Sequence, residues 1–317
     1  ANLLVVITLG SLVWAGWPAL QLGFKWISYA NDDMANYCLA AERFGAQGFF
    51  DVPTMAQLGG RDYPAYYFFM HVADMMRFGA EHLVAWGAGL AGLKATQVFM
   101  PVILALMLTQ LWAAAALVLH AGRWRRQALL TAGLLAVAPL FMLGALYQLI
   151  AQVAGIALML ATLALLTRRW GRLARADLIR HGVLTGVLAA ALCIAYPEPT
   201  PFLALAYFLY LGIGWWRKQA SLAAATGVLA YTMLSVVILL RYNVISYVST
   251  LTMQLGSATH EGNLLLSLFP YFLVPTGFSN LFGWMPIARD FAEPVVSASI
   301  LGGLARSEEH TSELQSR

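Results

Sequence analysis

Two adjacent aspartates are the sharpest chemical feature of the sequence. Asp32 and Asp33 stand in the run Asn31-Asp32-Asp33-Met34, shortly after a long apolar segment. Like charges this close raise the pKa of one carboxyl, which suits a general base. The pair could also hold a divalent cation through carboxylate oxygens. Alternatively, Asn31 or Asp32 caps a helix that begins here, with Asp33 favourable in its first turn.

A further candidate carboxylate is Glu198, in the run Tyr196-Pro197-Glu198-Pro199 between two apolar stretches. An ionisable residue next to a membrane is a functional candidate. The alternative is a hydrated turn, in which a carboxylate costs nothing and needs no function.

The composition places the chain among membrane proteins. Hydrophobic residues make up 60% of the 317 residues and charged residues 11%, against roughly 45–50% and about 25% in soluble domains. Long stretches, such as 1–24, 95–122 and 127–167, contain no Asp, Glu, Lys or Arg. The sequence therefore predicts an all-α, polytopic membrane protein.

The lengths of the apolar stretches predict how often the chain crosses the membrane. About 20 apolar residues span the hydrocarbon core. On this basis we expect seven complete transmembrane helices and a truncated eighth that begins near Val295, all in one domain that covers residues 1–305. The seven helices are predicted at 3–20, 96–119, 128–146, 149–166, 182–197, 200–216 and 220–240.

The basic residues predict the orientation. The loops 121–127, 167–181 and 215–219 are rich in arginine and contain a single acid, Asp177. Short loops with such an excess of Lys and Arg face the cytoplasm. We therefore expect a multi-pass protein of the bacterial inner membrane, with a cytoplasmic N-terminus and with segments 21–95 and 242–293 outside. The basic loops serve as orientation signals, so no nucleic-acid partner is expected.

The first outer segment, 21–95, is long enough to contain structure of its own. An apolar helical pattern covers 34–44, where Tyr37 and Phe44 share one face, and a second covers 65–78. Two amphipathic surface helices are therefore predicted to lie along the membrane, in contact with its lipids.

Taken together, these features resemble the GT-C class of membrane glycosyltransferases, closest to the protein mannosyltransferase and aminoarabinose transferase group. The likeness covers roughly residues 1–120: an apolar helix, an acidic pair, a surface helix and the run Arg61-Asp62-Tyr63-Pro64. Asp32 matches the first acid of the family's pair, and Asp33 stands where the family has glutamate. Ala65 replaces the second proline of the family's Pro-Pro step.

The resemblance implies transfer of a sugar from a polyprenyl-phosphate-linked donor to an acceptor at the outer face, with inversion at the anomeric carbon. It assigns Asp32 and Asp33 as catalytic residues, or as ligands of a divalent cation if one is needed. Substrate-binding roles are then expected for Arg61, Tyr63, Tyr37 and Glu198. Other cations that could face the leaving phosphate are Arg77, Lys94, Arg241 and Arg289.

Two other classes of function remain open. A transporter would place ionisable residues or unwound helices near the midplane of the membrane, whereas most acids of this chain lie in the outer segments. A non-catalytic membrane subunit would tolerate the loss of the acidic pair.

The last residues, 306–317, read RSEEHTSELQSR and differ in character from the rest of the chain. They resemble the in-frame translation of a sequencing adapter. We therefore expect this non-native tail to take no part in the fold, and the native chain to continue beyond Ala305.

Overall fold

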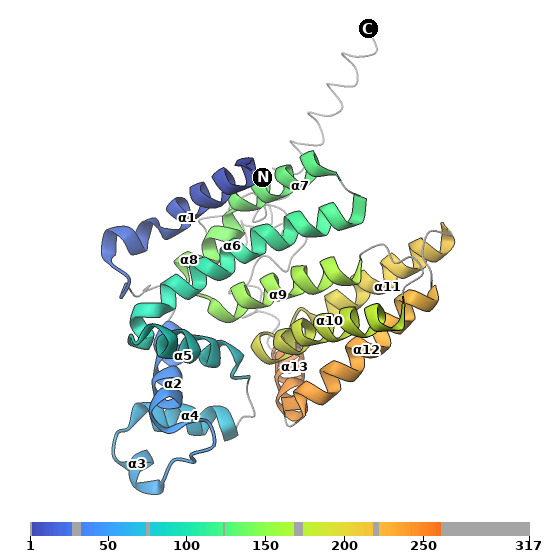
Figure 1. Ribbon diagram of the computed structural model, residues 1–317. Helices are drawn as coiled ribbons and strands as arrows, with labels where there is room; N and C mark the ends of the chain where they lie inside the picture. The colour runs from blue at the N-terminus through green and yellow to red at the C-terminus, as the bar shows by residue number, and fades with distance from the viewer. Residues whose placement is uncertain are drawn as a thin grey trace. The chain divides into compact units, whose positions relative to one another are not determined.

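The computed structural model is all-α in the residues that it describes, which are 2–26, 33–73, 77–122, 124–167, 174–217, 222–241 and 243–260. Thirteen helices follow one another along these residues (Figure 1). Asp32, the predicted eighth helix and the tail 306–317 lie outside them. The helices are α1 (Asn2–Leu22), α2 (Asp33–Gln47), α3 (Met55–Gly59), α4 (Tyr63–Ala73), α5 (Gly79–Ala91), α6 (Ala95–Gly122), α7 (Arg125–Ala136), α8 (Pro139–Leu146), α9 (Ile150–Leu166), α10 (Arg175–Ala195), α11 (Thr200–Trp216), α12 (Leu222–Leu240) and α13 (Asn243–His260).

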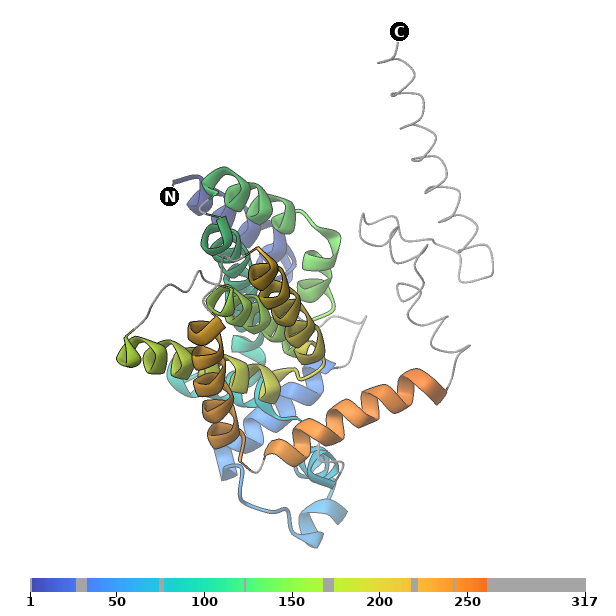
Figure 2. The same cartoon turned by 90° about the vertical axis from the view of Figure 1, so that its right-hand side faces the viewer.

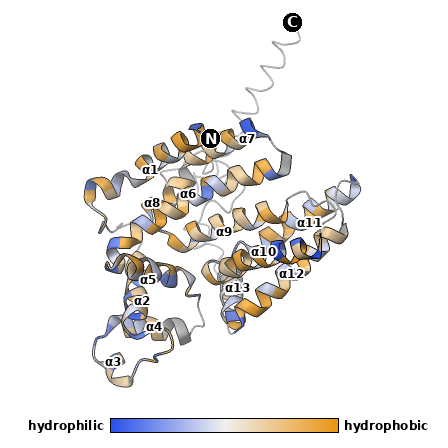
Figure 3. Cartoon of the chain, viewed as in Figure 1, coloured by the Kyte–Doolittle hydropathy of each residue, from blue (hydrophilic) through white to orange (hydrophobic). Residues whose placement is uncertain are grey.

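Four of the described helices, α1, α6, α10 and α12, are long and apolar enough to cross a membrane. Two shorter apolar helices, α9 and α11, accompany them. Figure 3 shows hydrophobic residues along most of these helices and hydrophilic ones at the starts of α7 and α10. The prediction of a multi-pass membrane protein is therefore supported, whereas seven complete spans are not confirmed.

The predicted span 128–146 is wrong as a single helix, because the chain leaves the helix at Val137 and Ala138. Helix α7 ends before these residues and α8 begins at Pro139. Proline has no N–H to donate, and its ring disfavours helical backbone in the preceding residue. Apolar length alone could not reveal the break, since the stretch is apolar on both sides of it.

Helix α10 begins at Arg175 rather than at the predicted residue 182, so the predicted loop 167–181 is partly helical. Asp177 lies in the first turn, where a negative charge is favourable. The long side chains of Arg175 and Arg180 can keep their charges in water while the helix continues through the headgroup layer. The predicted start at residue 182, just after the last charged residue, is therefore too late in the chain.

Small residues bring α10 and α12 together. Gly182 and Gly186 face α12 from successive turns, and a Cβ on either would collide with Tyr231 or Ser235. This GxxxG spacing allows close backbone approach between membrane helices. The Thr232 hydroxyl adds a hydrogen bond to the Gly182 carbonyl at 3.3 Å.

Residues 21–95, the segment predicted to be the first outer one, have a core of their own. Both predicted surface helices are present, as α2 and α4, and α3 and α5 accompany them. The second was predicted too long, because α4 ends at Ala73 and residues 77 and 78 are not helical. Their aromatic rings pack with centroids 4.4–5.8 Å apart in a group that consists of Phe44, Phe49, Phe68, Phe78 and His82. The buried Arg43 lies 5.0 Å from the Phe68 ring centre and donates to the Asp51 carbonyl at 2.7 Å. That these helices lie along the membrane remains a prediction.

Connections predicted to be outside contact one another within the larger compact unit, residues 1–137 and 142–252. Gln148 Nε2 donates to the Trp26 carbonyl at 2.8 Å, and Thr200 Oγ1 lies 2.9 Å from the Tyr247 hydroxyl. In two views, α2, α3 and α4 gather at the end of this unit away from the start of α1 (Figures 1 and 2). The side of the membrane on which each connection lies, and the compartment that each end faces, remain predictions.

Candidate functional site

A group of polar side chains surrounds Arg77, in the connection between α4 and α5. We name it the Arg77 cluster; its members are Asp33, Tyr37, Tyr67, Arg77, Glu81, Tyr196 and Glu198. The first outer segment supplies all but the last two, which come from the turn between α10 and α11. The cluster therefore joins two parts of the chain that the sequence predicts on the same side of the membrane.

The Arg77 guanidinium contacts both parts. Its Nη1 atom lies 2.6 Å from Glu198 Oε1 in an ion pair, and its Cζ lies 5.2 Å from the centre of the Tyr196 ring. It also forms a hydrogen bond with the Tyr37 hydroxyl. A charge-assisted hydrogen bond is roughly twice as strong as a neutral one, so these contacts fix the position of the guanidinium.

The ion pair is partly open to solvent. The side chain of Arg77 is 17% exposed and that of Glu198 is 19% exposed. The second carboxylate oxygen of Glu198, Oε2, is buried and has no hydrogen-bond partner among the described residues. Burial raises the pKa of Glu198, and Arg77 opposes the rise. Buried acceptors normally have a hydrogen-bond partner. An acceptor without one in the described part of the chain therefore suggests that a ligand or a water molecule donates to it.

Glu81 brings a second carboxyl to the cluster. It lies in the first turn of α5 with only 1% of its surface exposed, and its Oε2 atom has no partner among the described residues. Burial raises its pKa to about 7, while its backbone hydrogen bond and Arg77 act in the opposite direction. A carboxyl that titrates near neutral pH can gain or lose a proton under physiological conditions, and such groups concentrate at functional sites.

Two tyrosine hydroxyls lie near these charges. Burial raises the pKa of both Tyr37 and Tyr67, and the negative charges of Glu81 and Asp33 add to the rise, while Arg77 opposes it. Both hydroxyls therefore stay protonated and can donate hydrogen bonds. Asp33, at the start of α2, is counted in the cluster because of the effect of its negative charge on these two tyrosines.

Two glycines allow the close approach that brings the cluster together. A Cβ on Gly79, at the start of α5, would lie 2.5 Å from the Ala195 Cα at the end of α10. A Cβ on Gly155 of α9 would lie 2.5 Å from the Tyr196 Cβ. Real Cβ atoms do not come this close to other atoms. The backbone contact at Gly79 thus sets Arg77, two residues earlier, beside the turn that carries Glu198.

The structure brings together some of the predicted site residues and leaves others apart. Asp33, Tyr37 and Glu198 belong to the Arg77 cluster. Arg61 precedes α4 and Tyr63 begins it. Both side chains are exposed, and neither side chain forms a hydrogen bond or ion pair within the described part of the chain. Their predicted contact with a lipid phosphate stays a prediction.

The metal interpretation of the acidic pair also stays a prediction. Asp33 is the first residue of α2, a place that suits either a functional carboxylate or a helix-stabilising one. Asp32 lies outside the described residues. Among the residues that are described, no group of three or more His, Cys, Asp and Glu side chains could hold a metal ion.

Sequence reasoning missed Glu81 and did not favour Arg77. Arg77 was one of several basic candidates, and only the fold distinguishes it, because its partner Glu198 is 121 residues away in the chain. Glu81 carried a local signal: it is an acid inside the apolar run Gly79–Ala91, which forms α5. An acid on the buried side of a short helix needs a partner or a function.

The chain matches no protein-family model, no curated protein and no solved structure. The case for its function therefore rests on the Arg77 cluster and on the motifs of the sequence.

Proposed function

We propose that the protein transfers a sugar from a polyprenyl-phosphate-linked donor to an acceptor at the outer face of a bacterial inner membrane. The observation that carries the proposal is the partly exposed Arg77, which is held among carboxyl and phenol groups. Asp33, the first residue of α2, acts on the same group. Such a site could receive both the anionic and the hydroxyl groups of a phosphorylated sugar.

Arg77 is proposed to face the phosphate of the lipid. When the bond between the anomeric carbon and the phosphate oxygen breaks, the electron pair stays with the departing polyprenyl phosphate, which gathers negative charge. A fixed guanidinium stabilises that charge, and its planar donors match phosphate oxygens. We assign this role to Arg77 because it is fixed among acidic and phenolic groups, whereas Arg61 is exposed.

Asp32 is proposed as the general base. It takes the proton of the acceptor hydroxyl while the acceptor oxygen attacks the anomeric carbon from the face opposite the phosphate, so the configuration inverts. The open Oε2 atoms of Glu198 and Glu81 and the hydroxyls of Tyr37 and Tyr67 are proposed to hold sugar or acceptor hydroxyls. Asp33 assists, either by holding the acceptor or by sharing a cation with Asp32.

One observation favours an enzyme over a transporter. Helices α1, α6, α9, α11 and α12 contain no Asp, Glu, Lys or Arg. Coupled transporters usually bind their ions and substrates with ionisable residues or unwound helices near the midplane. In this chain the charged groups of the Arg77 cluster lie instead in the segment 21–95 and in a turn between helices, although the break between α7 and α8 does interrupt one apolar stretch.

The test is a transfer assay with the protein encoded by the complete gene, reconstituted in vesicles. Polyprenyl-phosphate hexoses, pentoses and amino sugars are supplied as donors, with an envelope extract as the source of acceptor. Release of polyprenyl phosphate together with incorporation of labelled sugar is the expected result. Asp32→Asn should lower the rate by about 10²–10⁴, the usual contribution of a general base. No release from any donor, or an Asp32→Asn variant of normal activity, would refute the proposal.

A further inference from the structure

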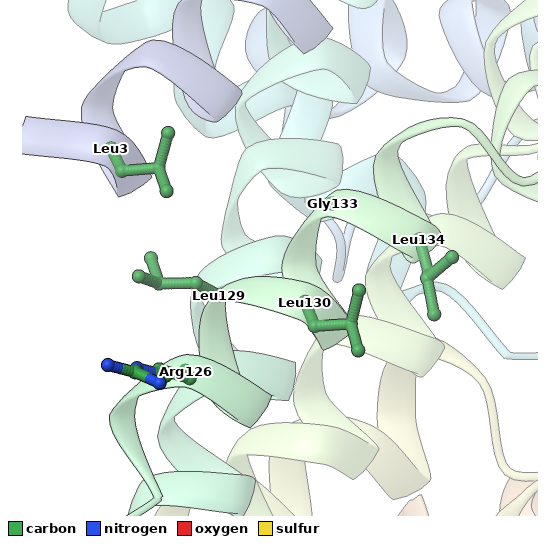
Figure 4. A pocket seen from close by; sticks show the side chains of 6 residues that line it. All are labelled: Leu3, Arg126, Leu129, Leu130, Gly133 and Leu134. Atoms are coloured by element: carbon green, nitrogen blue, oxygen red, sulfur yellow. The ribbon is translucent and has the colours of Figure 1, made fainter.

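Helix α7 borders an apolar hollow of about 390 Å³ against the start of α1. Figure 4 shows Leu3 of α1 facing the leucines of α7, with Arg126 at one end of the row. The residues that line the hollow are Leu3, Arg126, Leu129, Leu130, Gly133 and Leu134.

The α7 residues of the hollow form one stripe of the helix. Their spacing, from Arg126 through Leu129 and Leu130 to Gly133 and Leu134, follows the helical repeat. Gly133 has no side chain, and a Cβ at this position would meet only the Ile7 Cδ1 atom at 3.9 Å. One face of α7 therefore lines the hollow, with the charged Arg126 at one end of the row and leucines along the rest.

The opposite face of α7 is already in use. Ala128, Ala132 and Ala136 are buried, and the first two pack against Leu4 and Ile7 of α1 and against α6. Association of membrane helices favours small residues, because they let backbones approach closely. The small-residue face thus serves helix packing inside the protein, whereas Leu130 and Leu134 are exposed in the described part of the chain and suit a partner with flexible apolar chains.

We propose that this hollow binds an anionic phospholipid, with acyl chains on the leucines and the phosphate group at Arg126. Charge and shape both favour this occupant. Arg126 and its neighbour Arg125 are exposed. Residues 121–127, which include both arginines, contain no acid that would neutralise them. Basic sites beside membrane helices attract anionic headgroups.

The test uses the protein encoded by the complete gene, purified in a neutral detergent and titrated with phosphatidylglycerol or phosphatidylethanolamine under native mass spectrometry. Phosphatidylglycerol should bind more tightly. Arg126→Gln should weaken its binding about fivefold, the factor expected from one basic residue near an anionic headgroup. Arg125→Gln is the matched control, because it removes the same charge one residue outside the lining, and it should change the binding less than twofold.

A second variant tests the apolar part of the hollow. Gly133→Leu adds a side chain to it, and the Cβ itself would stand at an ordinary van der Waals distance from Ile7. Once its unfolding temperature shows that it folds, the variant should bind both lipids more weakly. Equal effects of the two arginine variants would mean that only surface charge matters, and would overturn the proposal. Unchanged lipid binding by Gly133→Leu would overturn it too.

Discussion

Arg77 and Glu198 stand 121 residues apart in the chain, yet their Nη1 and Oε1 atoms lie 2.6 Å apart. This ion pair connects the segment between α4 and α5 to the turn between α10 and α11. Since the two side chains are less than one-fifth exposed, the loss of one partner leaves the other charge poorly solvated. The pair thus couples the position of the outer segment to the membrane helices.

Arg77→Gln should therefore destabilise the protein more than the double variant Arg77→Gln/Glu198→Gln. The single change leaves a partly buried carboxylate without its counter-ion, whereas the double change removes both charges. Residues in direct contact typically show coupling of about 0.5–3 kcal/mol. Unfolding temperatures in detergent measure the difference.

Lys94→Gln is the control for this comparison, because Lys94 is an exposed cation of the same outer segment, and it should leave the unfolding temperature unchanged. Additive effects of the two cluster substitutions would contradict a coupled pair. If Arg77 also faces the lipid phosphate, both cluster variants should lose transfer activity, while Lys94→Gln keeps it.

Glu81→Gln should remove a pH dependence of stability. Burial raises the pKa of Glu81 from the ordinary 4.5 to about 7, so between these values the folded protein holds a proton that the unfolded chain has released. The associated stability is fully present below about pH 4.5 and is lost as the pH rises through 7. At about 1.4 kcal/mol per pKa unit, the loss is on the order of 3 kcal/mol well above pH 7.

Unfolding temperatures of the wild type and of Glu81→Gln between pH 5 and 8 check this sign. The wild type should lose stability relative to the variant as the pH rises, because the glutamine stays neutral throughout. Glu42→Gln, an exposed acid on α2, should follow the wild type. A wild type whose stability relative to Glu81→Gln stays constant or rises toward pH 8 would show that folding does not raise the pKa of Glu81.

Asp33→Asn should reduce transfer less than Asp32→Asn does. Asp33 lies in the first turn of α2, where its charge contributes about 0.3–1 kcal/mol to the helix, and the base is proposed to be its neighbour. If the pair holds a divalent cation, chelation with EDTA should reproduce the Asp33→Asn effect on the wild type. Equal losses for the two variants without any effect of EDTA would contradict this division of roles.

Cysteine labelling should place Gln57 and Arg172 on opposite sides of the membrane. Cys38 and Cys193 form no disulfide in the structure, so both are first replaced by alanine. In intact cells, a membrane-impermeant maleimide should then label Gln57→Cys and leave Arg172→Cys unlabelled until the cells are lysed. Labelling of both positions from the outside would invalidate the predicted orientation.

The sequence predicted the helical class well, because runs without charge are a direct sign of membrane helices. It failed before Pro139, where the backbone rather than the apolar character interrupts a helix, and at Arg175, where a helix begins before the charge-free stretch. Both errors concern the ends of helices. Charge and hydropathy constrain where a helix must be, and constrain much less where it stops.

The candidate site was predictable only in part. Asp33, Tyr37 and Glu198 stood out by residue type and by position near apolar stretches. The pairing of Arg77 with Glu198 depends on the packing of α5 against the end of α10, which no local pattern encodes. Glu81 was hidden because its helix, α5, was not predicted.

The contact between Gly79 and Ala195 carries a genetic consequence. A single base change in a glycine codon gives alanine, and at Gly79 the new methyl group would lie 2.5 Å from the Ala195 Cα. In the variant protein, this methyl group would push α5 away from α10 and separate Arg77 from Glu198. Every functional side chain would still be present in the sequence. A screen for inactive alleles should thus recover codon 79 alongside those of the Arg77 cluster, although glycine itself has no group that could bind or react.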